Sequence, residues 1–490
     1  MMLNRISKYA ILIIVLLCLV SRMPQLFSEN LILDGDESIV ALMAKHLLEL
    51  KEFPIFFYGQ SYGFSFVEVL TTSLFYTIFG ITDIAVKLAM LSLWTIGIIF
   101  FYKTLKEIGF KSNPWIPLLI TLVFIFSPSF AVWSMKARGG YLTAFMLSSI
   151  ITFLIVHKKS HSRLLKSLII GFLIIVVYQA QPLWLAGLFP LLAYYLIKNR
   201  SIHNVLMTLL GVLVGLFTFY FIKKGLSTYW SPNVLGDLDV SLKSFKSIFD
   251  RMFISFTGSY YFGRIIPPLF IMKAISILMM LLILVSTFMG IFFLIKRKKV
   301  NPLFYVFILS VLGSLAYLLF IHNSDYRYLL PLTGYTLLMV AFTVSHIKST
   351  QLANTLIIIW IASGMYSLYN FKDYAFDDKE ALISLVDELE RKEISHIFCE
   401  GGMLQWQIMF YSNEQIIARF YFNTDRYPAY VRSVNANYKE RKEHTALVGY
   451  YKKELAETLS DFTSINDVFY IHTPVSEEFL IEREFDLTEP

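Results

Sequence analysis

Eleven apolar runs, separated by polar stretches that are mostly short, constrain the fold of this 490-residue chain more than any other feature. Most of them approach the ~20 residues that an α-helix needs to cross a bilayer. With 56 % apolar and 16 % charged residues, the chain has more apolar surface than a soluble core can bury. The composition therefore excludes a soluble enzyme and a disordered chain, and it predicts a polytopic α-helical membrane protein. The runs lie at 9–27, 82–102, 115–133, 141–157, 166–180, 183–197, 203–222, 269–295, 302–321, 328–346 and 352–370.

The basic residues between the runs predict how the chain crosses the membrane, because cytoplasmic loops are enriched in Lys and Arg. The apolar segment 64–79 is short for a span and contains Glu68, so we interpret it as an interfacial helix. With eleven spans, every strongly basic short loop then falls on the cytoplasmic side. We expect a multi-pass protein of the cell membrane with a cytoplasmic N-terminus and an extracytoplasmic C-terminal segment.

The charges divide the chain into two parts. Residues 1–370 contain 30 Lys and Arg against 13 Asp and Glu, whereas residues 371–490 contain 13 against 23. The first part is predicted to be a transmembrane domain with two long outer loops, 24–81 and 223–268. The second is predicted to be a small extracytoplasmic α/β domain that docks on the membrane body, because no flexible linker precedes it. Its expected helices lie at 378–391 and 403–410, and its expected strands at 395–399, 416–420 and 467–472.

Two surface helices are expected in the first outer loop, and the spacing of apolar residues after residue 38 is that of an amphipathic helix. Lys45 falls on the polar side of this helix and His46 on its apolar side. A helix of this kind is typical of a membrane surface. The second helix is the interfacial segment 64–79.

Several function classes lack support in the sequence. It contains no Walker loop, no Gly-x-Gly-x-x-Gly and no His-Glu-x-x-His, which are the patterns for nucleotides, dinucleotides and zinc. The cysteines, Cys18 and Cys399, are too few for a disulfide framework or a metal knuckle. The basic residues lie at the ends of spans and form no continuous stripe, so nucleic acid is not expected as a partner.

Three carboxylates directly after the first span are the strongest candidates for chemistry. Asp34, Asp36 and Glu37 lie within four positions, and clustered acids raise one another's pKa, which can produce a proton acceptor. A structural interpretation is equally compatible, since Asp34 followed three residues later by Glu37 is typical of a helix cap. Both interpretations stay open, because a cap would also fix the carboxylate that follows it.

Basic side chains in two outer turns are candidates for binding an anion. Lys136 and Arg138 lie in Trp133–Tyr141, against the positive-inside pattern, and the arginine offers a planar fork to a phosphate. The alternative is an ion pair with the three carboxylates, or contact with lipid headgroups. Arg327 is a second candidate, for which a local pair with Asp325 is the alternative.

A polar, aromatic stretch between the two surface helices can contribute further contacts. Tyr58, Gln60 and Tyr62 could hydrogen-bond and stack on a polar ligand, although aromatic residues at a bilayer interface also serve as anchors. The Gly-x-Ser-x-Gly at 59–63 is not a nucleophile elbow, because no doubly wound sheet surrounds it. The acids offer too few oxygens for a hard metal site, even with Glu68, so no cofactor is predicted, although a divalent cation is possible.

Taken together, these residues resemble the GT-C superfamily of polyprenyl-phosphate-sugar glycosyltransferases, which includes protein O-mannosyltransferases and the lipid A aminoarabinose transferase. The resemblance covers the whole chain, and the order of one span, an acidic outer loop and a many-spanned body is its stronger half. One departure is that Tyr58–Gly63 stands where the aminoarabinose branch has Lys-Pro-Pro, which gives Arg138 more weight. The similar motifs are Asp36-Glu37, Tyr58–Gly63 with Glu68, Ala137–Tyr141, Gln181–Leu183, Arg327–Pro331, Gln405–Phe410 and Arg426–Tyr430.

This resemblance implies an inverting hexosyl- or pentosyltransferase that moves a sugar from a polyprenyl-phosphate donor to a protein, lipid or glycan hydroxyl on the outer face of the membrane. It implies that Asp36 accepts the proton of the acceptor hydroxyl, with Glu37 or Asp34 assisting or capping. Arg138 and Arg327 would neutralise the departing phosphate, and Lys136, Tyr58, Gln60, Tyr62 and Glu68 complete the expected donor site.

Three other functions are weighed against this one. A lipid-linked glycan polymerase or ligase would share the lipid phosphate and the outer site. A secondary transporter would place ionisable residues and an internal repeat at mid-membrane, and the spans 115–133 and 302–321 carry no charge. A non-catalytic scaffold that presents the acidic C-terminal segment is the third.

Overall fold

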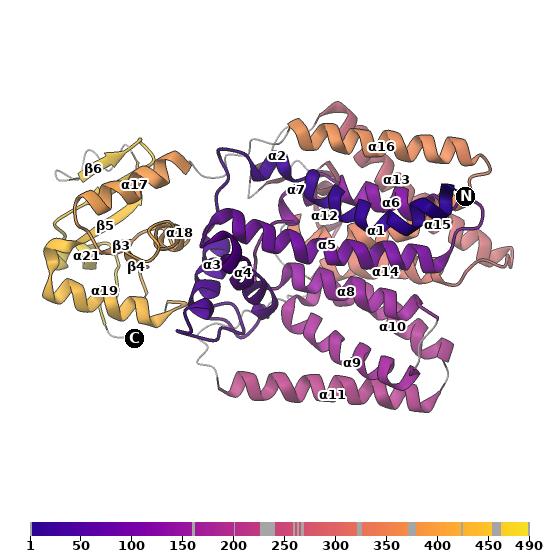
Figure 1. Cartoon of the computed structure of the whole chain (residues 1–490), viewed down its shortest axis with the longest axis horizontal. Helices are drawn as coiled ribbons and strands as arrows, with labels where there is room; N and C mark the ends of the chain where they lie inside the picture. The colour runs from indigo at the N-terminus through magenta and orange to yellow at the C-terminus, as the bar shows by residue number, and fades with distance from the viewer. Residues whose placement is uncertain are drawn as a thin grey trace.

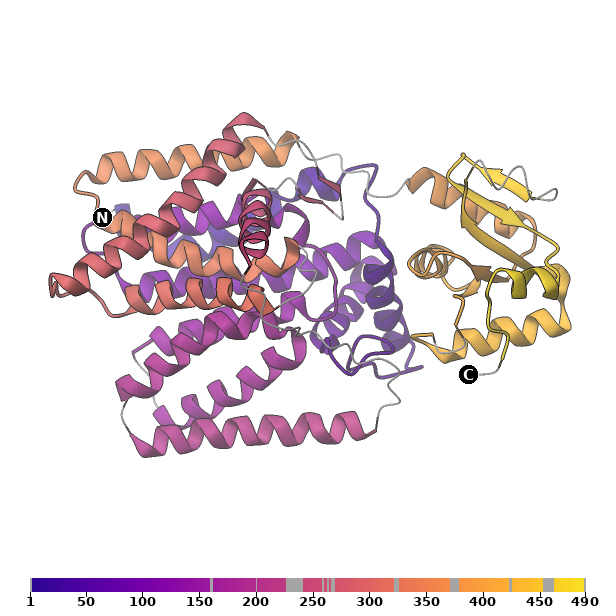
Figure 2. The ribbon, with the colours of Figure 1, turned by 180° about the vertical axis from the view of Figure 1, so that it is seen from behind.

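A helical bundle and a small mixed α/β domain at one of its ends make up the computed structural model (Figure 1). The N-terminus lies at the opposite end of the bundle, and Figure 2 shows the C-terminal domain from behind as a separate yellow lobe. We call the end of the bundle that carries this domain the domain end. The structure describes residues 2–158, 162–199, 201–225, 241–257, 260–261, 264–265, 269–320, 326–370, 379–422, 425–452 and 462–488.

Each of the eleven predicted runs forms a helix, which confirms the polytopic helical fold expected from the sequence. In the described part of the chain, eight helical stretches are long and apolar enough to cross a membrane, while α6, α8 and α10 are shorter. The helices are α1 (Met2–Val20), α5 (Asp83–Ile108), α6 (Ile116–Ile125), α8 (Tyr141–Val156), α9 (Arg163–Ala180), α10 (Leu185–Asn199), α11 (Ile202–Lys224), α13 (Phe270–Ile295), α14 (Leu303–Tyr317), α15 (Leu330–Ser345) and α16 (Thr350–Asn370).

The expected span 115–133 is divided in the structure. Helix α6 ends at Ile125, and the short helix α7 (Phe130–Trp133) follows after a turn. Pro128 lies in this turn, and a proline disfavours helical backbone at the residue before it. The division places the segment after Trp133, which carries Lys136 and Arg138, at the domain end of the bundle.

The first long loop contains the two helices predicted there, α3 (Gly35–Leu48) and α4 (Phe66–Phe79), after a single turn, α2 (Met23–Leu26). Both lie between the bundle and the C-terminal domain (Figure 1). Lys45, expected on a polar face, is 5 % exposed. The reason is that α18 of the C-terminal domain covers this side of α3, so α3 is enclosed by protein on both sides.

The second long loop, 223–268, contains α12 (Leu242–Thr257) and a two-residue pairing of β1 (Tyr260–Tyr261) with β2 (Arg264–Ile265). The rest of this loop, and the expected domain boundary at 370/371 with the residues that follow it to 378, lie outside the described residues.

The C-terminal domain is built on a five-stranded sheet in the order β4-β3-β5-β7-β6. Strands β4 (Ile417–Arg419), β3 (His396–Cys399) and β5 (Thr445–Tyr450) are parallel, whereas β7 (Phe469–His472) and β6 (Phe462–Ile465) run antiparallel to their neighbours. All five predicted elements are present, and among the described residues β5, β6, α19 and α21 are additional. The helices are α17 (Lys379–Arg391), α18 (Leu404–Tyr411), α19 (Pro428–Glu440) and α21 (Glu477–Glu482).

The domain is docked on the bundle, as the absence of a linker predicted. The Tyr411 hydroxyl accepts a hydrogen bond from the backbone N–H of Leu33 at 3.0 Å, and Gln407 donates to the Leu33 carbonyl at 2.9 Å. Gly35 lies against Met403 so closely that a Cβ atom there would meet its backbone at 2.7 Å. The start of α3 is therefore fixed from the domain side.

Candidate functional site

A capping box fixes the beginning of α3 and with it the acidic motif. Asp34 is the N-cap residue, and its side chain accepts a hydrogen bond from the Glu37 backbone N–H at 2.9 Å. The Glu37 carboxylate in turn accepts from the Asp34 backbone N–H at 3.1 Å. The structural interpretation of the Asp34 and Glu37 spacing is thus confirmed, and the cap positions Asp36 in the first turn of the helix.

Three basic side chains from the bundle pair with the three carboxylates. Lys136 Nζ lies 2.5 Å from Asp34 Oδ2, and Lys87 Nζ lies 2.5 Å from Glu37 Oε1. Arg138 contacts Asp36 Oδ2 through Nη2 at 2.5 Å and through Nε at 2.8 Å. These six residues are the ion-pair cluster. The ion pairing that was the alternative for Lys136 and Arg138 is therefore present in the structure.

The pairs differ in how far they are removed from solvent. Lys136 and Glu37 are fully buried, whereas the side chains of Asp36 and Arg138 remain 16 % and 22 % exposed. Although burial opposes ionisation of Asp34, the charges of Lys136 and Arg138 hold its pKa well below its usual value. The partly accessible members of the cluster are thus the Asp36–Arg138 pair and Asp34, whose side chain is also 16 % exposed, whereas Lys136, Glu37 and Lys87 are enclosed.

Glu68 on α4 holds the turn that carries Arg138. Its fully buried carboxylate accepts backbone hydrogen bonds from Leu142 at 3.0 Å and from Arg138 and Thr143 at 3.3 Å. Since Gly140, the N-cap of α8, has no side chain to cap the helix, a carboxylate from another helix supplies the cap. Burial raises the pKa of Glu68 from 4.5 to about 7, against the lowering effect of these N–H groups.

A glycine makes this turn possible. Gly140 has a φ of +97°, a region that favours glycine, and a Cβ atom there would lie 2.8 Å from the Ala180 carbonyl oxygen and 2.9 Å from that of Phe64. The backbone between Arg138 and α8 is therefore pressed between two other segments.

Arg327 and Tyr62 lie beside the accessible pair. Arg327 is close enough for its charge to act on Arg138, and its guanidinium carbon lies 6.0 Å from the centre of the Tyr141 ring. Burial raises the pKa of Tyr62 to about 12, with opposing effects from nearby Asp36 and Arg327. The predicted alternative for Arg327, a pair with Asp325, lies outside the described residues.

Tyr58 and Gln60 are placed differently from Tyr62. Both are less than 9 % exposed, and the Tyr58 hydroxyl lies 2.7 Å from His46 Nδ1 and donates to Glu52 at 2.9 Å. Tyr58 therefore belongs to a second polar cluster, at the other end of α3. Gln60 is packed in the same loop, with its side-chain oxygen near Gly63.

This second cluster, the docking cluster, joins the bundle to the C-terminal domain. Glu414 Oε2 lies 2.6 Å from Lys45 Nζ, and Oε1 lies 2.9 Å from His46 Nε2. The Tyr430 hydroxyl also donates to Glu414, at 2.7 Å. Although burial opposes ionisation, these hydrogen bonds lower the pKa of Glu414 from 4.5 to about 2. The docking cluster comprises Lys45, His46, Glu52, Tyr58, Glu414 and Tyr430.

Two positions that the sequence analysis did not select support the ion-pair cluster. Lys87 lies in the first turns of α5. The signal that could have identified it is a lysine inside a long apolar helix. Arg22 is fully buried, donates to Ser134 Oγ at 2.7 Å and to the Ile125 carbonyl at 2.9 Å, and stacks over Trp94. Arg22 thereby fixes the segment that leads to Lys136.

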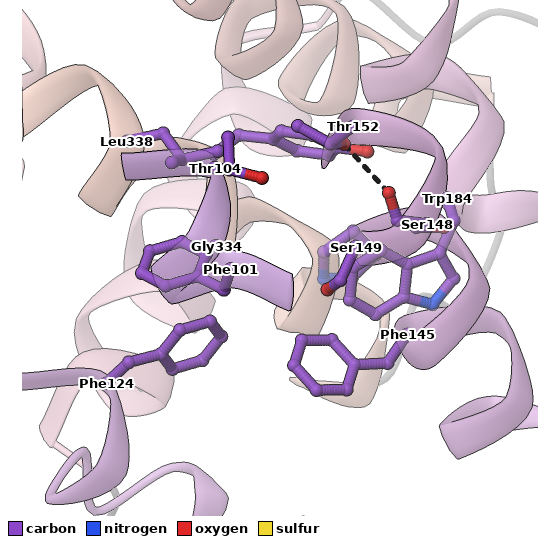
Figure 3. A pocket seen from close by; sticks show the side chains of 12 residues that line it. Phe101, Thr104, Phe124, Phe145, Ser148, Ser149, Thr152, Trp184, Gly334 and Leu338 are labelled. Carbon is purple, nitrogen blue, oxygen red and sulfur yellow. Dashed lines mark hydrogen bonds between the residues drawn. The ribbon is translucent and has the colours of Figure 1, made fainter. Parts of the chain in front are cut away.

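The described residues group no metal site, and the cavity enclosed between α5, α6, α8 and α15 is small. No three His, Cys, Asp or Glu side chains among them are grouped to hold a metal ion. A cavity of about 20 Å³ lies in the bundle between α5, α6, α8 and α15, with Phe145, Trp184 and the bonded pair Ser148 and Thr152 in its wall (Figure 3). Ligand pockets for small molecules have about 300 to 1,000 Å³, so this cavity is too small for a sugar or a lipid chain.

Comparison with solved structures supports the fold. The crystal structure of ArnT from Cupriavidus metallidurans bound to undecaprenyl phosphate matches 99 % of this chain and 99 % of its own, with a TM-score of 0.52 and 12 % sequence identity. The GT-C-like fold predicted from the sequence is thus confirmed. No protein-family model matches the sequence, and no curated protein is significantly similar to it.

Proposed function

We propose that this membrane protein is an inverting glycosyltransferase that moves a sugar from a polyprenyl phosphate to an acceptor hydroxyl at the domain end of the bundle. The observation that carries the proposal is the accessible pair of Asp36 and Arg138, fixed by the α3 cap and by Glu68. The similar fold of ArnT, whose structure contains undecaprenyl phosphate, supports the choice of donor. We place the protein in the cell membrane with the domain end outside.

The transfer needs one general base and one anion-binding group. The acceptor oxygen attacks the anomeric carbon of the sugar as the bond from this carbon to the phosphate oxygen breaks, and polyprenyl phosphate leaves with the bonding electrons. Both contacts of Arg138 fall on Asp36 Oδ2, so Oδ1 is the atom that we assign to accept the proton of the hydroxyl. General-base help of this kind is worth about 10² to 10⁴ in rate.

The departing phosphate gains a negative charge as the sugar leaves, and the neighbouring cations stabilise it. Arg138 offers a planar fork that can turn from Asp36 to a phosphate oxygen, and Arg327 lies close enough to act with it. Lys136, fully buried against Asp34, contributes its charge from a fixed position. Tyr62, beside Asp36, is assigned to the sugar.

The remaining predicted site residues are assigned to hold Asp36, Arg138 and the loop before α4 in place. Glu68 holds the turn of Arg138, and Glu37 caps α3 while it is paired with Lys87. Tyr58 and Gln60 shape the loop before α4 from buried positions. We assign no cofactor to the site, because each of the three carboxylates is already paired with a basic side chain.

Mass spectrometry of cell-surface glycans and glycoproteins tests the proposal and identifies the sugar. We expect a glycan that is lost without the gene, is restored by the wild type, and is not restored by Asp36→Asn. Glu49→Gln is the matched control, because Glu49 lies at the opposite end of α3 with a partly exposed side chain. A surface glycome that is identical with and without the protein would contradict the proposal.

A further inference from the structure

Arg426 of the C-terminal domain extends toward the loop between α3 and α4. The guanidinium carbon of Arg426 lies 5.2 Å from the centre of the Phe57 ring, in the loop between α3 and α4. Gly59 in the same loop has a φ of +70°, and a Cβ atom there would lie 2.7 Å from the Arg426 Cα. The backbone of Arg426 therefore touches the loop that leads to Tyr62.

The position of Arg426 is well fixed. Its backbone N–H donates to Asp425 Oδ1 at 2.6 Å, while the other oxygen of Asp425 accepts from Gln405 at 2.9 Å. The next residue, Tyr427, stacks on Tyr58 of the docking cluster with ring centres 4.8 Å apart. Docking of the domain thus sets where the guanidinium lies.

The charge of Arg426 is not matched within the described part of the protein. Its Nη1 atom is buried and has no hydrogen-bond partner there, and no carboxylate of the described residues lies within ion-pair distance. Its neighbour Asp425 accepts from the Arg426 backbone N–H and from Gln405, and among the described residues it forms no ion pair with the guanidinium. A buried donor without a partner is costly, so such a group is expected to meet an anion in the functional state.

The ring beneath Arg426 connects it to the turn of Arg138. Phe57 lies against Gly139, where a Cβ atom would be 3.2 Å from the Phe57 ring, and Gly139 directly follows Arg138. Asp36 and Arg426 also both act electrostatically on Tyr62, which is in the same loop as Phe57. The carboxylates of the ion-pair cluster already have their own basic partners, so a further guanidinium here adds positive charge. A phosphate group, with several acceptor oxygens and a charge near −2 as a monoester, fits this surplus.

We infer that Arg426 of the C-terminal domain is a phosphate-binding residue of the active site, so that the site is complete only when the domain is docked. The inference rests on the proposed function for the identity of the site. The phosphate belongs either to the polyprenyl carrier or to a soluble phosphorylated acceptor, and the guanidinium recognises the same group in both.

Binding of two probes to the full-length protein in nanodiscs tests this inference. The probes are undecaprenyl phosphate and glycerol 3-phosphate. We expect Arg426→Gln to weaken binding of one of them about tenfold or more, as the loss of a charged hydrogen bond does. The affinity of Arg426→Lys for that probe should lie between those of Arg426→Gln and the wild type. The probe that responds identifies the source of the phosphate. Arg432→Gln is the control, because Arg432 is exposed on α19.

Two outcomes would contradict the inference, and they differ in what they say about the proposed function. If wild type binds a probe and Arg426→Gln binds it equally well, Arg426 has no role in phosphate binding, and the proposed function is unaffected. If wild type binds neither probe, the proposed function fails as well. An unchanged melting temperature of Arg426→Gln shows that a loss of binding is not caused by misfolding.

Discussion

The two ends of α3 carry polar clusters that differ in where their partners come from. The ion-pair cluster, at the N-terminal end, pairs the acids of the helix with basic residues of the bundle, and its Asp36–Arg138 pair is partly exposed. In the docking cluster, at the C-terminal end, the signs are reversed, because Lys45 and His46 of the helix meet Glu414 of the domain.

The difference shows that ion pairing alone does not identify a functional site in this protein. Both clusters contain buried, hydrogen-bonded charges, which cost free energy to desolvate and are expected to be retained for a purpose. The partners of the docking cluster come from two domains, so its purpose is assembly. The ion-pair cluster joins α3 to the bundle and keeps two partly exposed carboxylates, Asp34 and Asp36, and one partly exposed guanidinium, as a site for substrate requires.

The comparison of the two clusters predicts that, among substitutions other than that of Asp36, replacing Arg138 lowers the transfer activity most. Arg138→Gln removes a cation from the proposed leaving-group site, and the loss of one such stabilising donor lowers rates by about 10² to 10³. Arg138→Lys should recover part of the rate. Lys45→Gln in the docking cluster should transfer sugar within a few fold of wild type, measured in membrane vesicles at neutral pH. Equal losses in the two clusters would remove the distinction between them.

Lys136→Met tests the buried part of the ion-pair cluster. Removing one partner of a buried pair leaves the other charge unpaired, which typically costs about 3 to 5 kcal/mol. Asn can still cap a helix, so Asp34→Asn combined with Lys136→Met should be more stable than the sum of the single effects. Thermal unfolding of the four proteins in detergent measures this coupling. Additive effects of the two substitutions on the unfolding free energy would show that there is no coupling between Asp34 and Lys136.

Glu68→Gln should loosen the turn that carries Arg138. One oxygen of Glu68 accepts from Leu142 and Thr143 and the other from Arg138, and an amide can replace only one of them. An unsatisfied buried donor costs about 1 to 3 kcal/mol. Hydrogen exchange of 138–143 should therefore become faster in the variant. Unchanged exchange there would mean that Gly140 and its neighbours hold the turn without the carboxylate.

The smallest predicted effect is a loss of domain docking in acid. Since the pKa of Glu414 falls from 4.5 to about 2 in the folded protein, its contribution is fully present above pH 4.5 and is lost as the pH falls toward 2. Limited proteolysis of the full-length protein by an acid-active protease between pH 5.5 and 2.5 should show this change in wild type. Glu414→Gln should be cleaved at a rate that varies less over the same pH range. A parallel pH dependence would assign the change to other groups.

The sequence predicted the local features of the fold well. The apolar runs located all the long helices, and the Asp34-to-Glu37 spacing predicted the cap that the structure shows. It did not locate the end of α6 at Ile125, although Pro128 in the turn that follows was visible in the sequence. In the C-terminal domain, strand β5 was missed because its signal is a short apolar run that periodicity does not assign to a strand.

The contacts between distant segments could not be predicted. Lys87 pairs with Glu37 across 50 residues, and His46 meets Glu414 across 368, distances over which sequence patterns carry no information on contact. For the same reason, Tyr58 was grouped with Tyr62 as a ligand contact, although the structure bonds Tyr58 to His46 and Glu52 of the docking cluster. The fold thus separates Tyr58 from Tyr62, which are close in sequence, and it brings Arg426 of the C-terminal domain to the loop that contains both.

The initial rate of sugar transfer by Asp36→Asn is the most direct test of the central claim that Asp36 is the general base. The measurement uses the full-length protein in nanodiscs with the donor identified by mass spectrometry, and undecaprenyl phosphate binding serves as the check on folding. We predict a rate about 10² to 10⁴ lower than wild type, with binding retained. A variant that transfers sugar at the wild-type rate would contradict the account.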